Sequence, residues 1–206
     1  MNAKRNAAVP LLAVLALGLA GCNTAGKLAD QQTVEGAQQV CSSCHGSDGR
    51  GVAPTFPRLA GQQQEYLVTQ LKAFRDKTRA DPHAHTYMWG MAAKLTDPTI
   101  EGLAAAYAAM SPAPGTPGDP VAAAAGASIF RDGIEARDVP ACQTCHGEKA
   151  EGNGPYPRLA GQQRFYLERQ LAAFASNTRA NEIMHANSLN LTPAEISQVA
   201  AYLSAQ

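Results

Sequence analysis

The sequence contains one pattern of residues twice, and this repeat constrains the fold more than any other feature. The segment C-S-S-C-H at residues 41–45 recurs as C-Q-T-C-H at residues 142–146. Similarly, P-R-L-A-G-Q-Q at residues 57–63 recurs unchanged at residues 157–163. Self-similarity at a fixed spacing indicates one structural unit present more than once. The chain is therefore expected to form two similar domains.

Both copies predict the same helices. After the second motif, apolar residues recur at helical spacing over residues 66–74 and again over residues 166–174, which indicates amphipathic helices. A second apolar stripe follows each Leu-Thr pair, and Thr96 and Thr192 are placed to serve as N-caps. Neither copy contains a convincing run of alternating β-branched residues. The predicted fold class is therefore all-α.

The predicted domains are residues 33–110 and residues 121–206, joined by a linker at residues 111–120. The linker is rich in proline and glycine, which is typical of a semi-stiff connection. The domains themselves are poor in bulky apolar side chains, since 40 of the 206 residues are alanine. Domains of this size have difficulty burying enough apolar surface. We therefore expect another group to fill the centre of each domain.

The C-x-x-C-H motifs suggest which group this is. Two thiols at this spacing can form thioethers to the vinyl groups of a haem while the following imidazole binds its iron, so the motif is the signature of haem c attachment. A zinc site would require both C-x-x-C pairs in one cluster. A thioredoxin-like redox pair would lie near a βαβ pattern, which this sequence lacks. The sequence therefore predicts two haem c groups, bound covalently by Cys41, Cys44, Cys142 and Cys145 and ligated by His45 and His146.

The repeat also indicates the second axial ligand of each iron. Met88 lies seven residues before Leu95, and Met184 lies seven residues before Leu191, at the shared Leu-Thr pair of each copy. A methionine is more often a core residue than a ligand. The equal spacing, together with the need for a sixth ligand, nevertheless favours Met88 and Met184.

Four other side chains are rivals for this role. His185 is adjacent to Met184, but the first copy has a tryptophan at the equivalent position. Met91 has no methionine counterpart in the second copy, and His83 and His85 fall in a stretch that the second copy shortens. These two histidines are expected to be solvent-facing loop residues.

Residues 1–22 predict an export signal. Lys4 and Arg5 precede an apolar run at residues 9–19, which is too short to span a bilayer comfortably. The run leads into L-A-G-C, which resembles the lipobox of bacterial lipoproteins, whose cysteine thiol is acylated and whose cysteine becomes the new N-terminus after cleavage. By this resemblance Cys22 carries a lipid anchor.

Residues 23–32 would then form a polar tether between the lipid and the first domain. The alternative is an ordinary secretory signal cleaved after Ala20, which leaves Cys22 as a free thiol. A lipid anchor explains why the chain has five cysteines, since four belong to the two motifs. We expect a periplasmic protein tethered to a membrane by Cys22.

The charge balance excludes one class of partner. The chain has 17 basic and 17 acidic residues and a net charge of zero. Proteins that bind nucleic acids need a basic excess or stripe to neutralise phosphates. No nucleic-acid partner is therefore expected.

Together these motifs resemble the diheme cytochrome c4 family, in which two class I c-type cytochrome domains occur in tandem. The resemblance covers about residues 33 to 206. It implies His/Met ligation of each iron, by His45 with Met88 and by His146 with Met184. It also implies that the carbonyls of Pro57 and Pro157 accept hydrogen bonds from the ligand imidazoles. Arg58 and Arg158 could offset haem propionate charge, although such arginines are more often solvated.

The function that the resemblance implies is electron transfer from a quinol-oxidising complex to a terminal oxidase. With protein ligands on both sides of each iron, no enzymatic activity and no small-molecule substrate are expected. One alternative is an electron-accepting subunit of a membrane-associated dehydrogenase complex. A diheme peroxidase is a third hypothesis, which predicts that one copy lacks its methionine; both copies have one.

Overall fold

The computed structural model describes residues 20–206, with side chains from residue 33 onward. Helices account for all the regular secondary structure in this part of the chain, apart from two isolated β-bridges, so the predicted all-α class is confirmed. The elements are α1 (Ala20–His45), α2 (Gln64–Arg75), the π-helix η1 (Ala84–Met88), α3 (Trp89–Ala92), α4 (Asp97–Ala108), α5 (Pro120–Asp132), the 3-10 helix η2 (Glu135–Arg137), α6 (Gln143–His146), α7 (Arg164–Ala175), α8 (Glu182–Ser188) and α9 (Pro193–Ser204).

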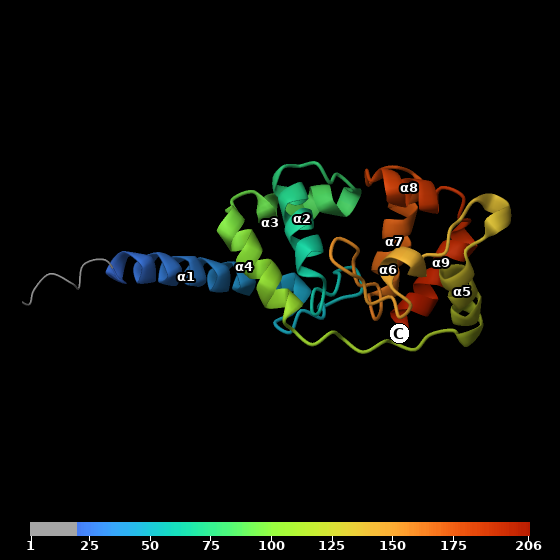
Figure 1. The fold of residues 1–206 in the computed structure, drawn as a ribbon, viewed down its shortest axis with the longest axis horizontal. Helices are drawn as coiled ribbons and strands as arrows, with labels where there is room; N and C mark the ends of the chain where they lie inside the picture. The colour runs from blue at the N-terminus through green and yellow to red at the C-terminus, as the bar shows by residue number, and fades with distance from the viewer. Residues whose placement is uncertain (1–19) are drawn as a thin grey trace, which may run out of the picture.

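The helices form two bodies that lie side by side (Figure 1). In the first half, α4 packs against both α1 and α2. In the second half, α9 packs against both α5 and α7. The prediction of two similar helical domains in tandem is therefore confirmed.

Threonine side chains begin the last helix of each half, as the sequence predicts. The Thr96 hydroxyl accepts a hydrogen bond from the backbone N–H of Thr99 at 3.3 Å. The Thr192 hydroxyl accepts from the N–H of Glu195 at 3.3 Å, and the Glu195 carboxylate accepts from the Thr192 N–H at 2.8 Å. This reciprocal pair is a capping box, which satisfies backbone groups that the helix leaves unpaired.

The two cores are built alike. The first contains Leu67 and Leu103, and the second contains Leu167 and Val199 at the equivalent positions. The first cysteine of each motif packs against the core of its own half: Cys41 in the first and Cys142 in the second. The helices thus bring each cysteine–histidine motif to the centre of a half.

The halves differ where they approach these motifs. Helix α1 runs without interruption into the first motif. In the second half α5 ends at Asp132, and Gly133 with φ 71° turns the chain into a loop before the short α6. The predicted tether, residues 23–32, lies within α1. Most of the predicted signal, and the side chain of Cys22, lie outside the described residues. In the part of the chain that is described, no helix is long and apolar enough to cross a membrane.

Two glutamine side chains join the halves through reciprocal hydrogen bonds, which we call the glutamine clasp (Gln62, Gln162 and the backbones of Arg58 and Arg158). Gln62 Nε2 donates to Arg158 O at 2.9 Å, and its Oε1 accepts from Arg158 N at 2.6 Å. Gln162 makes the same two bonds to the backbone of Arg58, at 2.9 and 2.7 Å. The same residues thus meet from both sides, as at an interface with twofold symmetry.

The linker is packed rather than free. The Thr116 N–H donates to Ser204 O at 2.7 Å, and the Arg58 guanidinium donates to Pro114 O at 3.0 Å. A Cβ at residue 115 would lie 2.3 Å from Ala205 O, so the close approach of the linker to the chain after α9 requires glycine at this position. The guanidinium of Arg58 therefore ties the linker to the domains, and the expectation that this side chain is merely solvated is wrong.

The glutamine clasp generates a prediction about stability. In a Gln162→Ala variant the backbone N–H and carbonyl of Arg58 lose their partners, and unpaired buried polar groups cost roughly 2 kcal/mol. We expect the free energy of unfolding, measured by urea titration, to fall by about this amount. The matched control is Gln163→Ala, because the Gln163 side chain makes only an exposed contact of 3.4 Å to Arg50 O. Equal stabilities of the two variants would contradict the role of the clasp.

Candidate functional site

The first motif lies at the C-terminal end of α1. Cys41 and Cys44 are three residues apart on this helix, so both thiols lie on the same face. His45 is the last residue of the helix. Gly46 then adopts φ 80°, a conformation that other residues rarely take, and its N–H donates to Ser42 O at 2.9 Å. The helix therefore ends directly after the histidine.

The second motif has the same arrangement on a shorter helix. Cys142 precedes α6, and Cys145 and His146 lie on it. Gly147 has φ 84°, and its N–H donates to Gln143 O at 2.9 Å. The predicted cysteines and histidine of each copy are thus brought together, once in each half.

Both histidines are held by prolyl carbonyls. His45 Nδ1 lies 3.0 Å from Pro57 O, and His146 Nδ1 lies 3.0 Å from Pro157 O. Because a carbonyl oxygen can only accept, each Nδ1 carries the proton and each neutral ring has its lone pair on Nε2. The predicted hydrogen bonds are confirmed, and they leave the nitrogen that can bind a metal free of a proton.

The surroundings of the two imidazoles favour their neutral form. His45 and His146 are 7% and 6% exposed. Burial lowers the pKa of both rings, although the hydrogen bonds to Pro57 and Pro157 oppose this shift. Each ring also has an aromatic neighbour at an equivalent position, since Phe56 lies edge-on to His45 and Tyr156 edge-on to His146.

The cysteines are half-buried free thiols. Burial raises the pKa of Cys41 and raises that of Cys142 to about 11, which keeps both thiols protonated at neutral pH. Two thiols on one helical face, followed by an imidazole with a free Nε2, are the donor set that haem c attachment requires. Among the described residues, no group of three or more His, Cys, Asp or Glu side chains could hold a metal ion, as a zinc site would require.

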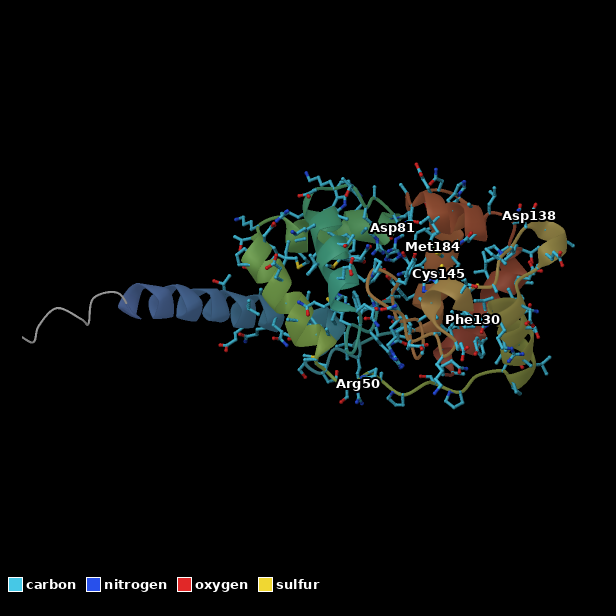
Figure 2. All side chains as sticks on the ribbon, in the orientation of Figure 1. Arg50, Asp81, Phe130, Asp138, Cys145 and Met184 are labelled. Atoms are coloured by element: carbon cyan, nitrogen blue, oxygen red, sulfur yellow. The ribbon has the colours of Figure 1, made fainter. Side chains whose placement is uncertain are left out.

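Each predicted methionine lies in the same half as its histidine. Met88 ends η1 and packs against a buried cluster of Phe74, Ala84 and Ala92. Met184 lies on α8, where its backbone N–H donates to the side chain of Asn181 at 2.9 Å. Figure 2 places Met184 in the same half as Cys145.

The rival side chains have other environments. His185 is half-buried, and its Nδ1 donates to Phe174 O at 2.8 Å. Met91 is 57% exposed. His83 and His85 are exposed, as expected, but neither lies in a loop: His85 lies in the π-helix η1, and His83 is its helical N-cap residue. The first copy is longer here, and its helical stretch contains this π-helical turn, which the sequence pattern did not predict.

A buried polar cluster lies between the two halves, and we call it the arginine cluster (Arg79, Arg179, Gln70, Gln170 and Asp81). Arg79 Nη2 donates to Gln170 Oε1 and Arg179 Nη2 donates to Gln70 Oε1, both at 2.8 Å. Both arginines are more than nine-tenths buried. Sequence reasoning missed this cluster, although Gln70 and Arg79 recur as Gln170 and Arg179.

Asp81 is the one carboxylate in this cluster, and it lies between the halves in Figure 2. It is 2% exposed and forms an ion pair of 2.8 Å with Arg79 Nε. Burial alone would raise the pKa of this carboxyl, but the two arginines outweigh burial and the pKa lies below its usual value. The second half has Asn181 at the equivalent position, so the cluster contains two positive charges and one negative charge.

Comparison with known proteins identifies similar sequences and structures. A family model described as cytochrome c matches residues 34–106 and again residues 123–206. Cytochrome c4 of Azotobacter vinelandii is 35% identical over 202 residues, which cover 92% of this chain and 94% of the relative. The solved structure of Acidithiobacillus ferrooxidans cytochrome c4 has a TM-score of 0.78 and 41% identity, covering 81% of this chain and 98% of that one.

Another similar protein has a different description. The thiosulfate dehydrogenase electron acceptor of Thiomonas intermedia is 33% identical over 205 residues, which cover 96% of this chain and 93% of the relative. Proteins that resemble the whole chain therefore include both cytochromes c4 and an electron acceptor of a dehydrogenase.

The ion pair of Asp81 generates a prediction about stability and pH. An Asp81→Asn variant leaves two buried guanidinium groups without a carboxylate, and breaking a buried pair in this way costs about 3–5 kcal/mol. We expect urea titration near pH 7 to show a loss of this size. The pKa of Asp81 in the folded protein is lower than the pKa of a free Asp, which is about 4. The difference in unfolding free energy between wild type and Asp81→Asn is therefore full above about pH 4 and disappears as pH falls through the pKa of folded Asp81.

The control for this prediction is Asp132→Asn, because Asp132 is exposed at the end of α5. Its stability should stay within about 0.5 kcal/mol of wild type. A difference between wild type and Asp81→Asn that does not shrink in acid would show that the ion pair is not its source.

Proposed function

The chain belongs to the cytochrome c family, and from this premise we propose which residues hold its haem groups and which proteins exchange electrons with it. Its similarity to cytochromes c4 makes it a diheme electron-transfer cytochrome with two covalently bound haem c groups. Each group supplies an iron that cycles between Fe(II) and Fe(III). The side chains around the iron attach the haem, ligate its iron and influence its reduction potential.

We assign one haem to each half of the chain. Cys41 and Cys44 attach the first haem, and Cys142 and Cys145 attach the second. His45 and His146 are the proximal ligands. The observation that carries this assignment is the pair of hydrogen bonds to Pro57 and Pro157 at 3.0 Å, because they leave an unprotonated Nε2 on each buried ring.

Met88 and Met184 are the second axial ligands in this proposal. Their support is the equal spacing in the two copies and their location in the same half as His45 and His146. Methionine ligation raises the reduction potential of a haem. With both axial positions filled by protein, the protein acts as an electron carrier rather than as an enzyme.

The two halves act as one electron-transfer unit. We propose domains at residues 33–110 and 121–206 with residues 111–120 between them. The glutamine clasp and the arginine cluster support a fixed arrangement of the halves, since both consist of hydrogen bonds between them. Such an arrangement would keep the two haem sites at a constant separation, as electron transfer within a single chain requires.

Redox proteins are the partners that this chemistry requires. We propose a quinol-oxidising complex as electron donor and a terminal oxidase as acceptor. The similarity to a thiosulfate dehydrogenase electron acceptor supports a second candidate, in which the chain is the electron-accepting subunit of a dehydrogenase complex. Copurification with a dehydrogenase from native membranes favours the second candidate, whereas isolation of the cytochrome alone favours the first.

We place the protein in the periplasm, held to a membrane by an acyl group on Cys22. The support is the sequence of residues 1–22, in which a basic segment and a short apolar run lead into L-A-G-C. The membrane would bring the chain close to membrane-bound redox complexes. Each buried CH₂ of an acyl chain contributes about 0.8 kcal/mol to membrane binding.

The proposed methionine ligands generate a spectroscopic prediction. Oxidised haem with His/Met ligation shows a weak sulfur-to-iron charge-transfer band, so Met88→Ala and Met184→Ala should each remove one half of the band in the wild-type protein. The measurement is an absorption spectrum of each purified, oxidised variant. Met91→Ala is the matched control, because Met91 is exposed on α3, and it should leave the band intact. An unchanged band in either ligand variant would overturn that assignment.

The proposed anchor generates a second prediction. The protein made with its own leader should enter the detergent-rich phase in a detergent partition experiment, because the acyl chains are apolar. A variant in which a cleavable secretory leader replaces residues 1–22 should lose both Cys22 and the apolar run, stay in the aqueous phase and still contain two haems, since residues 1–22 lie outside both C-x-x-C-H motifs. Equal partitioning of the two proteins would refute the lipid anchor.

A further inference from the structure

The first half contains a buried hydroxyl that no described residue satisfies. Tyr107 lies on α4 and is 4% exposed. Its Oη has no hydrogen-bond partner among the described residues. A buried hydroxyl without a partner costs free energy. We therefore expect an acceptor within hydrogen-bonding distance of the Tyr107 hydroxyl.

The position of Tyr107 indicates where this acceptor lies. Tyr107 belongs to the core cluster of Leu67 and Leu103, and Cys41 packs against the same cluster. Burial raises the pKa of Tyr107 to about 12, with a smaller contribution from the neighbouring Cys41 thiol. The tyrosine is therefore a neutral hydroxyl donor at physiological pH, and it is close to the residue that attaches the first haem in our proposal.

The second half has no such donor at the equivalent position. Counting from Thr96 and Thr192, Tyr107 corresponds to Leu203. Leu203 is 2% exposed and lies in the core against which Cys142 packs. Tyr107 and Leu203 thus each lie in the core that packs against the first cysteine of the motif in the same half, and of these two residues Tyr107 alone carries a hydroxyl.

We propose that Tyr107 donates a hydrogen bond to an acceptor on the edge of the first haem, beside Cys41, and thereby raises the reduction potential of that haem alone. The acceptor is the thioether sulfur formed by Cys41. This inference rests on the proposed attachment of a haem at Cys41 and Cys44.

The direction of the effect follows from the charge that oxidation adds. Oxidation adds a positive charge to the haem, and the positive end of the Tyr107 O–H dipole disfavours that charge. A hydrogen bond also withdraws electron density from the sulfur and so from the haem edge to which it is attached. Loss of the hydroxyl therefore lowers the potential of the first haem.

The test is a spectroelectrochemical titration of the diheme Tyr107→Phe protein, which keeps the ring and removes only the hydroxyl. At a fixed potential, we expect the ratio of reduced to oxidised first haem to fall about threefold to tenfold, where tenfold corresponds to about 59 mV for one electron. The second haem should titrate as in wild type. The pH dependence of the first potential should stay as in wild type, because a thioether sulfur does not titrate; a changed pH dependence would overturn the sulfur as acceptor.

Leu203 provides the matched control in the second pocket. Leu203→Tyr and Leu203→Phe differ only in the hydroxyl, so a higher potential of the second haem in the tyrosine variant than in the phenylalanine variant supports the same mechanism. Haem content must first be measured for every variant. A wild-type protein that lacks haem on Cys41 and Cys44 refutes the proposed attachment itself. If Tyr107→Phe contains two haems and both reduction potentials equal those of wild type, the role of Tyr107 is refuted, even if the variant is less stable than wild type.

Discussion

One hydrogen bond in each half, from an imidazole to a prolyl carbonyl, fixes the tautomer and direction of the histidine on which the haem site depends. The carbonyls of Pro57 and Pro157 are themselves held in place by their loops. In the first loop Gly49 O accepts from the N–H groups of Leu59 and Ala60, and Ala150 O does the same in the second. The loop therefore closes on itself and presents its prolyl carbonyl to the ring. In the proposed assignment, covalent attachment through cysteine and ligation through histidine would act on groups that are already oriented.

The same loops connect the two halves. Arg58 directly follows Pro57 in the chain, and its backbone N–H and carbonyl are both paired with Gln162 of the other half. Gln62 binds the backbone of Arg158 in the same way. The residue that orients each imidazole is thus adjacent to the residue that joins the halves, so each imidazole is held by a loop that also forms the interface. Within the arginine cluster, Asp81 and Asn181 break this symmetry, as Tyr107 and Leu203 do in the two cores.

Local patterns in the sequence predicted most of the fold and the cysteine–histidine sites. The helices and the caps at Thr96 and Thr192 are confirmed, because each depends on residues close together in the chain. The hydrogen bonds of Pro57 and Pro157, which the family resemblance implied, are confirmed as well. The glutamine clasp was not predicted, since Gln62 bonds to a backbone 96 residues away and sequence spacing does not show such a partner. The packing of the linker against Ser204 and the π-helix at Ala84–Met88 likewise depend on tertiary contacts. The recurrence of polar residues on buried helix faces, such as Gln70 and Gln170, was the available signal for the arginine cluster.

Peptide mass spectrometry of the purified protein tests the central claim, that each half holds one haem through its own C-x-x-C-H motif. Proteolysis should release one haem-bearing peptide that contains Cys41 and Cys44, and another that contains Cys142 and Cys145. Thiol labelling of the unfolded protein before proteolysis should modify none of these four cysteines. A haem-free, labelled peptide from either motif would contradict the account.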